Sequence, residues 1–272
     1  MTFSVLMALA RPRVSLMVGA ATLFGALLAD GPLVLGLWAG LGSALLCAGC
    51  SGLNQVQERE RDALMERTRL RPLPAGELSV ARALACSLAA MGVGLGIYAA
   101  LGGVPLVFLG LAVILGYNGL YTPLKPVSSL SLLLGGLSGA VPPLVGWLAM
   151  GGGLGDARIL SVCAVLYLWQ VPHFWLIAEG HREDYRRARF AVPSLVLPEP
   201  LRKPLMGVWM LAYFTAILGM ALASPGAAAW TFGAAAIGLA AVLGFSLLGL
   251  ARAARASLNT VMVVSMLCLL AA

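Results

Sequence analysis

The sequence predicts an all-α membrane protein with nine transmembrane helices, and three observations lead to this fold class. First, 60% of the residues are hydrophobic and the mean hydropathy is +0.93, values that exclude an ordinary soluble domain. Second, the 272 residues supply about nine crossings with short connections, because one crossing takes about 20 apolar residues. Third, the basic residues fall almost entirely in alternate connections, as expected of a chain that crosses the membrane repeatedly.

Each expected helix corresponds to an apolar segment, and every break between segments contains glycine, proline or charge. The segments run roughly 14–30, 32–53, 78–100, 104–121, 128–150, 157–178, 204–222, 226–248 and 257–272. The first segment has no convincing cleavage site and eight more follow it, so we expect a retained helix rather than a signal peptide. No internal repeat divides the chain, and residues 1–272 are expected to form a single integral-membrane domain.

The distribution of lysine and arginine predicts how the helices are oriented. Of the 18 basic residues, 17 lie at the N-terminus, in the even-numbered connections or, in the case of Arg82, just inside the third segment, and Arg158 is the one on the other side. The positive-inside rule therefore places the N-terminus and the even connections in the cytoplasm, and the C-terminus outside. This topology also explains the formal net charge of +7, so we expect the lipid bilayer and no nucleic acid as a partner.

The long polar connection between the second and third segments carries acids, which topology alone does not require. Asn54, Glu58 and Asp62 follow one another at intervals of four, so on a helix their side chains share one face. Three oxygen-bearing side chains at the cytoplasmic end of a membrane helix suit Mg²⁺, which commonly bridges carboxylates to phosphates. A solvated loop with helical salt bridges is the alternative interpretation of the same residues.

Basic residues follow these acids along the same expected helix. Arg67 and Arg71 are again four apart, and Pro72 is expected to end the helix. Because the arginine fork matches phosphate geometry, acids followed by arginines indicate a site for a diphosphate held together with a cation. We assign the neighbouring charges to a solvated, cytoplasm-facing surface, namely Arg59, Glu60, Arg61 and Arg69.

A second cluster, again acidic and then basic, follows the sixth segment. Its members are Glu179, Arg182, Glu183, Asp184, Arg186, Arg187 and Arg189. Two such clusters on the cytoplasmic side of one bundle are suited to hold two cations and one diphosphate between them. Lys125 supplies a third basic point on that side.

His173 lies inside the sixth segment and shares a helical face with Trp169, four residues earlier. An ionisable group within a membrane helix is a functional candidate, and neutral imidazole is a usual axial ligand of haem iron. A hydrogen-bonded packing role for His173 is the alternative. Pro172 is expected to free a backbone carbonyl and to kink the helix.

Several motifs resemble those of one known family, the UbiA superfamily of intramembrane prenyltransferases. The stretch from Asn54 to Leu73 looks like the first aspartate-rich motif of that superfamily. Within this stretch the pattern of Asp62, Met65, Arg67-Thr68 and Arg71-Pro72-Leu73 resembles the branch that farnesylates protohaem IX. Further segments similar to that branch are RPRVSLMV near the N-terminus, GAVPPLVGW at 139–147, WQVPHF at 169–174 and REDY at 182–185.

The resemblance implies a fold and a set of roles. It implies nine transmembrane helices around a central cavity open to the cytoplasmic side, with Mg²⁺ as cofactor and an allylic diphosphate as donor. The implied Mg²⁺ ligands are Asn54, Glu58, Asp62 and Asp184. The implied diphosphate contacts are Arg67, Arg71, Lys125 and Arg182, and the implied haem contacts are His173 and Trp169. The catalytic role is expected of Asp62, Asp184 and Lys125.

The resemblance also implies a reaction and its setting. A farnesyl group is expected to pass from farnesyl diphosphate to the 2-vinyl group of haem B, forming haem O. The implied location is the cytoplasmic membrane of a prokaryote, with the active site on the cytoplasmic side. Haem A synthase or proteins of terminal oxidase assembly are the implied protein partners.

The sequence departs from the family pattern at three places. Glu58 stands where the family usually has aspartate, and Glu reaches one methylene further. Pro126 follows Lys125 where the family commonly has arginine. The second motif contains Asp184 as its clear aspartate, where other branches carry a pair. These departures bear on how diphosphate is bound more than on the class of reaction.

Two other functions remain open at this point. One is prenylation of an aromatic or quinone precursor, which a two-aspartate second motif without the PPLVGW and WQVPHF segments would favour. The other is haem binding without catalysis, and the intact Asp62, Arg67 and Arg71 argue against it.

Overall fold

The computed structural model describes residues 2–223, 233, 235, 237–239, 241 and 251–270. All regular secondary structure in these residues is helical, as the sequence predicts. The elements of the first half are α1 (Phe3–Ala10), α2 (Pro12–Leu28), α3 (Leu33–Asp62), α4 (Val80–Ile114), the π-helix η1 (Leu115–Tyr121), α5 (Thr122–Leu124) and α6 (Ser131–Ala140). The later elements are α7 (Pro142–Ala149), α8 (Ala157–Gly180), α9 (Arg182–Arg187), α10 (Pro193–Val196), α11 (Glu199–Ala223) and α13 (Ala251–Leu270).

Five helical stretches among the described residues are long and apolar enough to cross a membrane, and the bent pair of α1 and α2 raises this number to six. The five are Leu33–Asp62, Val80–Leu124, Ser131–Ala149, Ala157–Gly180 and Glu199–Ala223. Residues 255–270 of α13 form a shorter apolar helix. The predicted segment 226–248 lies mostly outside the described residues, so the total of nine spans stays a prediction.

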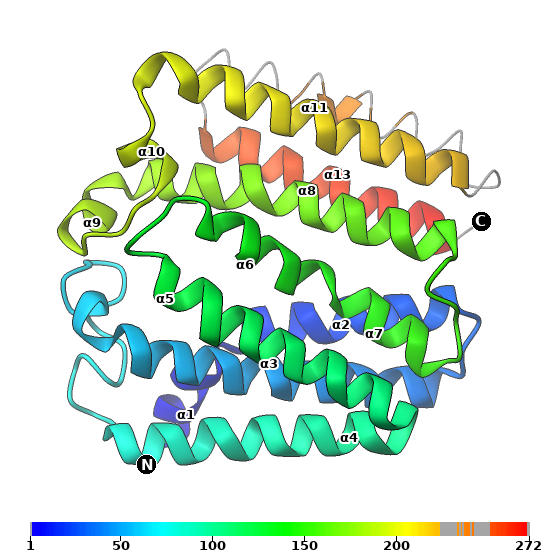
Figure 1. Cartoon of the computed structure of the whole chain (residues 1–272), viewed down its shortest axis with the longest axis horizontal. Helices are drawn as coiled ribbons and strands as arrows, with labels where there is room; N and C mark the ends of the chain where they lie inside the picture. Colours follow the sequence, from blue (N-terminus) through cyan, green and yellow to red (C-terminus); the bar gives the residue numbers. More distant parts are fainter. Residues whose placement is uncertain are drawn as a thin grey trace. The chain divides into compact units, whose positions relative to one another are not determined.

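The long helix α4 reverses its direction at Gly103. This glycine has φ 61° and ψ −149°, a backbone conformation that is essentially restricted to glycine. A Cβ added to Gly110 would contact the side chains of Leu95 and Tyr98, although a straight helix would separate positions 95 and 110 by about 22 Å. The two arms of α4 therefore lie side by side and run in opposite directions (Figure 1). The predicted boundary between the third and fourth segments falls at this glycine.

The chain forms two compact units, and the first comprises Met1–Gly152 and Glu183–Ala191. In this unit α3 packs against α2 and α4, and α2 also packs against α7. Thr22 donates a hydrogen bond to the Ser43 hydroxyl at 2.7 Å, and that hydroxyl lies 2.7 Å from the Tyr98 hydroxyl, which links α2, α3 and α4. Such hydroxyl contacts hold helices together in lipid, where burial of apolar surface gives no driving force.

The second unit comprises Gly153–Arg182 and Val192–Ala272, and its described part is built around α8. Helix α8 packs against α11 and α13, and it continues as one helix through Pro172. Tyr213 of α11 is fully buried, and its hydroxyl donates a hydrogen bond to the Leu258 carbonyl of α13 at 3.4 Å. The contacts of α13 with α8 and α11 place its side chains beside those of α8.

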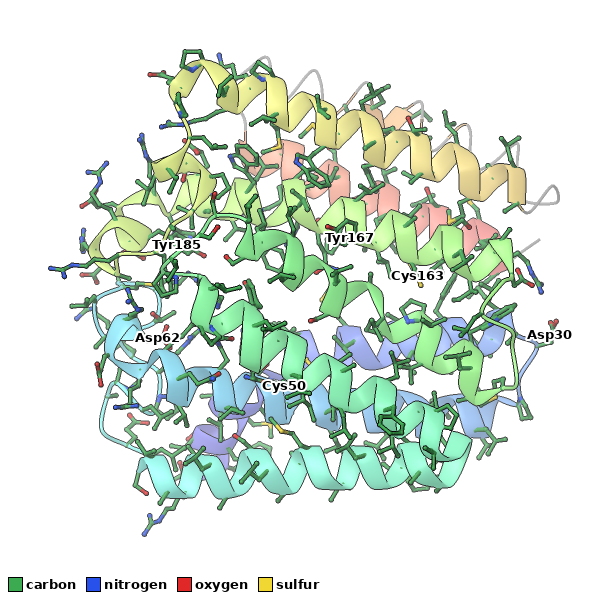
Figure 2. The ribbon with its side chains drawn as sticks, in the orientation of Figure 1. Asp30, Cys50, Asp62, Cys163, Tyr167 and Tyr185 are labelled. Atoms are coloured by element: carbon green, nitrogen blue, oxygen red, sulfur yellow. The ribbon has the colours of Figure 1, made fainter. Side chains whose placement is uncertain are left out.

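Helix α3 is longer than a membrane crossing requires. It contains 30 residues and therefore extends about 45 Å, whereas the hydrocarbon core of a bilayer is about 30 Å thick. Figure 2 places Asp30, just before α3, and Asp62, its last residue, at opposite ends of this helix. The surplus length accommodates the polar end of α3, where the predicted site residues lie.

Candidate functional site

The three predicted Mg²⁺ ligands of the first motif lie on α3 and are buried. Asn54, Glu58 and Asp62 expose 2%, 7% and 2% of their surface. Helix α3 continues without interruption to Asp62, so the interval of four residues places the three side chains on one face, as predicted. Their burial is inconsistent with the alternative interpretation as a solvated surface.

Two basic residues neutralise the two carboxylates. Glu58 Oε1 lies 2.8 Å from Lys125 Nζ, and Asp62 Oδ2 accepts a hydrogen bond from Arg71 Nη1 at 2.6 Å. The side chains of Glu58 and Asp62 are 9% and 3% exposed in these pairs, so solvent screens them weakly. The structure thus brings together the predicted acids of the first motif with two of the predicted diphosphate contacts.

A π-helical turn brings Lys125 to this position. In η1, Asn118 donates a hydrogen bond from Nδ2 to the Cys50 carbonyl of α3 at 3.0 Å. One turn later, Thr122 accepts a hydrogen bond from Asn54 Nδ2 at 3.1 Å. A π-helical turn shifts the side-chain register and is frequent at functional sites. Sequence reasoning missed Asn118 and Thr122, although an amide in an apolar segment was an available signal.

Arg67 and Arg71 do not lie on a helix, so the prediction of a helix that continues to Pro72 was wrong. Helix α3 ends at Asp62, and turns follow until α4. The Asp62 carbonyl accepts a hydrogen bond from the Thr68 hydroxyl at 2.9 Å, and its carboxylate binds Arg71. These local bonds compete with helical hydrogen bonds and fold the chain back before Pro72. The Arg67 side chain is exposed.

Asp184 binds the loop that carries Arg67. Its Oδ1 accepts a hydrogen bond from the Glu66 backbone N–H at 3.1 Å, and its Oδ2 accepts one from the Arg67 N–H at 3.3 Å. The Asp184 side chain is buried. The two predicted motifs are therefore in direct contact, and Asp184 fixes the backbone from which Arg67 projects.

The donor chemistry of the first motif fits Mg²⁺, although its carboxylates and Asp184 do not form a group of three acids around one point. Within the described part of the chain, no group of three or more His, Cys, Asp or Glu side chains is arranged to hold a metal ion. Asn54, Glu58 and Asp62 nevertheless offer buried oxygen atoms from one helix face, which suit a hard divalent cation. Ligation by these three and by Asp184 stays a prediction.

Arg61 was assigned to the solvated surface, and this assignment was wrong. Its Nη1 donates hydrogen bonds to the Ala188 carbonyl at 2.6 Å and to the next carbonyl at 3.1 Å. Its guanidinium carbon also lies 5.4 Å from the centre of the Phe190 ring. The Lys125 carbonyl accepts a hydrogen bond from Ala191 N–H at 2.9 Å. Arg61 and Lys125 therefore both bind the segment that follows α9.

The other three residues assigned to that surface are exposed, as predicted. Arg59 pairs with Glu60 at 2.8 Å, and Arg69 pairs with Glu66 at 2.7 Å. Exposed pairs of this kind add little to stability, because solvent screens them and two long side chains lose entropy. These residues do not belong to the candidate site.

The second unit contains the predicted haem contacts and Arg182. Trp169 and His173 share a face of α8, as predicted, with ring centroids 4.4 Å apart. Asn259 of α13 accepts a hydrogen bond from Trp169 Nε1 at 3.2 Å, and the same oxygen lies 2.9 Å from His173 Nδ1. The Nε of Arg182 is buried and has no hydrogen-bond partner among the described residues. Sequence reasoning missed Asn259, which lies 86 residues after His173.

Comparison with known proteins reveals similarity over most of the chain. The protoheme IX farnesyltransferase of Nitratidesulfovibrio vulgaris is 44% identical over 211 residues, covering 77% of this chain and 74% of that protein. The protoheme IX farnesyltransferase of Geobacter sulfurreducens is 50% identical over 179 residues, covering 65% of this chain and 66% of that protein.

A solved structure has the same fold. The structure of a UbiA homolog from Archaeoglobus fulgidus bound to GPP and Mg²⁺ matches with a TM-score of 0.63 at 16% sequence identity, covering 95% of this chain and 99% of that one. With its long apolar helices, the chain is an integral membrane protein. The model of the UbiA prenyltransferase family matches residues 16–269, and the chain therefore belongs to that family.

Proposed function

We propose that this chain transfers a farnesyl group from farnesyl diphosphate to the 2-vinyl group of haem B and so forms haem O. The relatives from N. vulgaris and G. sulfurreducens, both named as protoheme IX farnesyltransferases, support this substrate pair at 44% and 50% identity. The structural observation that carries the proposal is the pairing of Glu58 with Lys125 and of Asp62 with Arg71. It gathers two carboxylates and two cations at the polar end of α3, as a diphosphate and its metal require.

The basic residues of the site bind the departing diphosphate. Lys125 and Arg71 lie beside the carboxylates, and the exposed Arg67 projects from the loop that Asp184 holds. Arg182 offers a buried donor that has no partner among the described residues. As the allylic C–O bond breaks, negative charge grows on the diphosphate, and prearranged cations stabilise it.

Mg²⁺, when bound, neutralises further charge on the diphosphate and thereby helps it to leave. The A. fulgidus homolog solved with GPP and Mg²⁺ supports this cofactor. In this chain Asn54, Glu58 and Asp62, with Asp184, are the residues that would hold the ion. Lys125 and Arg71 lie beside these carboxylates and are the cations that would bind the diphosphate.

The remaining steps require an apolar chamber that excludes water, because water would quench the farnesyl cation. The 2-vinyl group of haem supplies the electron pair that forms the new C–C bond. Water then adds to the resulting haem-side cation and loses a proton, which gives the hydroxyethylfarnesyl side chain. His173 and Trp169 are the candidate contacts of the haem, since they present an imidazole and an aromatic face together.

The topology expected from the sequence completes the proposal. Nine transmembrane helices would surround a central cavity open to the cytoplasm, with the N-terminus inside and the C-terminus outside. The distribution of basic residues supports this orientation, because Arg158 is the one of 18 that falls on the other side. The proposed location is the cytoplasmic membrane of a prokaryote, where haem A synthase or terminal oxidase assembly proteins would receive the product.

The test is incubation of the purified protein in nanodiscs with haem B, farnesyl diphosphate and Mg²⁺, followed by mass spectrometry. We expect the hydroxyethylfarnesyl adduct of haem, and none after chelation of Mg²⁺. A parallel reaction offers 4-hydroxybenzoate as the acceptor. Prenylation of this aromatic acid and not of haem would contradict the proposal and favour the aromatic alternative.

A further inference from the structure

One oxygen atom of Asn259 contacts two side chains of α8. Trp169 Nε1 lies 3.2 Å from Asn259 Oδ1, and His173 Nδ1 lies 2.9 Å from the same atom. All three residues belong to the second unit, and they join α8 to α13. Trp169 is buried, while His173 and Asn259 are half-buried, so the contacts are sheltered from bulk solvent.

The indole fixes the orientation of the Asn259 amide. An indole nitrogen is a donor only, so the Asn259 atom that faces Trp169 must be the oxygen and not the NH₂ group. An amide oxygen cannot donate, so its bond with His173 requires the proton to be on Nδ1. The lone pair of the neutral imidazole then lies on Nε2.

The remaining surroundings of His173 leave Nε2 available. Its hydrogen bond to Asn259 is made through Nδ1, and Nε2 has no hydrogen-bond partner in the described part of the chain. The ring of Trp169 lies 4.4 Å from the imidazole at an angle of 32°, and the ring of Phe174 lies 5.4 Å away at 80°. These aromatic contacts fix the plane of the imidazole, while Asn259 fixes its protonated edge.

We infer that Asn259 is a positioning residue that holds His173 in the Nδ1–H tautomer and thereby presents Nε2 as a ligand to the iron of the haem substrate. The identity of this ligand rests on the proposed function, whereas the tautomer follows from the geometry alone. Histidines that bind metals commonly donate their other N–H to an oxygen acceptor, which orients the ring and raises its basicity. Asn259 supplies that acceptor here.

The tautomer is measured without haem, by ¹⁵N NMR of histidine-labelled protein in nanodiscs. The chain has two histidines, and His181→Gln leaves His173 as the one that is observed. His181 is exposed at the end of α8 and has no role in the proposed site, so this background is a fair reference. We expect a protonated Nδ1 and an unprotonated Nε2. A protonated Nε2 in the neutral ring overturns the inference.

Two substitutions at Asn259 separate positioning from packing. Asn259→Asp keeps an oxygen acceptor and is expected to keep the single Nδ1–H tautomer. Asn259→Leu has a similar volume and no acceptor, so we expect both tautomers to be populated. An Asn259→Asp protein that loses the tautomer, or an Asn259→Leu protein that retains it unchanged, overturns the role of Asn259. The aspartate variant keeps the test decisive if the leucine variant fails to fold.

The iron ligand is tested on the complex with ferric haem by EPR and electronic absorption. We expect a histidine-ligated spectrum that His173→Gln abolishes, and a reduction potential that is lower in Asn259→Asp than in Asn259→Leu. If His173→Gln leaves the iron spectrum unchanged while farnesyl transfer proceeds, the inference fails and the proposed function stands. If the ligation and tautomer hold but no adduct forms, the positioning role stands and the proposed function fails.

Discussion

Glu58 and Asp62 each lie against one cation, and both pairs are largely withdrawn from solvent. Removing one partner of a buried pair leaves an uncompensated charge, at a cost of about 3–5 kcal/mol. Substitutions in this cluster therefore alter stability as well as chemistry. Experiments on these residues need a variant that restores the charge balance, so that the two effects can be separated.

Asp62→Asn is expected to lower the rate of farnesyl transfer by at least about 100-fold, because it removes the negative charge that would hold the metal ion and that pairs with Arg71. The rate is measured with saturating haem and farnesyl diphosphate over a range of Mg²⁺ concentrations. Glu60→Gln is the matched control, since Glu60 is an exposed carboxylate two residues away on the same helix. Equal rates for the two variants would remove Asp62 from the active site.

Lys125→Met is expected to lower both stability and activity, because it leaves Glu58 without its cation. The double variant with Glu58→Gln is expected to recover stability but not activity, since both charges are then absent. Thermal unfolding in detergent and the rate of farnesyl transfer measure the two effects. Recovery of activity in the double variant would show that the pair is structural and that Lys125 does not act on the diphosphate.

Asp156 offers a pH prediction outside the membrane-spanning helices. Hydrogen bonds from the Arg158 side chain and backbone lower the pKa of Asp156 below its ordinary value of 3.8. The interaction therefore stabilises the folded protein above pH 3.8 and is lost as the pH falls through the lower, folded-state pKa. Arg158→Ala is expected to raise this pKa, as measured by ¹³C NMR of labelled aspartate. An unchanged pKa in this variant would exclude the Arg158 side chain as the main cause.

Among the structural elements, the segment after α9 depends on α3 for its position. Arg61→Ala removes two charge-assisted hydrogen bonds to the carbonyls of Ala188 and its neighbour. We expect faster amide hydrogen exchange in residues 183–191, because such bonds are each worth about 1.5–3 kcal/mol. We also expect slower farnesyl transfer, because this segment carries Asp184, which binds the loop of Arg67. Arg59→Ala is the control, since Arg59 is exposed and pairs with its neighbour. Equal exchange in the two variants would contradict the role of Arg61.

The helices were predictable from sequence because their signals are local. Apolar length, a break at Gly103 and the four-residue spacing up to Asp62 all depend on residues near one another in the chain. The loop after Asp62 was not predictable, since its side chains form hydrogen bonds that replace helical ones. Arg61 and Asn259 act on partners 127 and 86 residues away, and no local pattern reports such contacts.

On the scale of the whole molecule, the orientation in the membrane can be tested directly. Single cysteines at Glu77 and Leu154, both exposed, are introduced into a variant from which the five native cysteines are removed. A membrane-impermeant maleimide is expected to label position 77 from the cytoplasmic face and position 154 from the opposite face. Labelling of both positions from the same face would contradict the predicted topology.

The reversal at Gly103 has a consequence for how the chain enters the membrane. No charged residue occurs between Arg82, near the start of the first arm, and Lys125, so the rest of both arms and the turn between them are free of ionised groups. Moving the turn across the bilayer therefore requires the transfer of few polar groups beyond its own peptide bonds. The two arms are suited to partition from the translocon into lipid as one preassembled pair, with the turn leading and the charges at Arg82 and Lys125 retained behind.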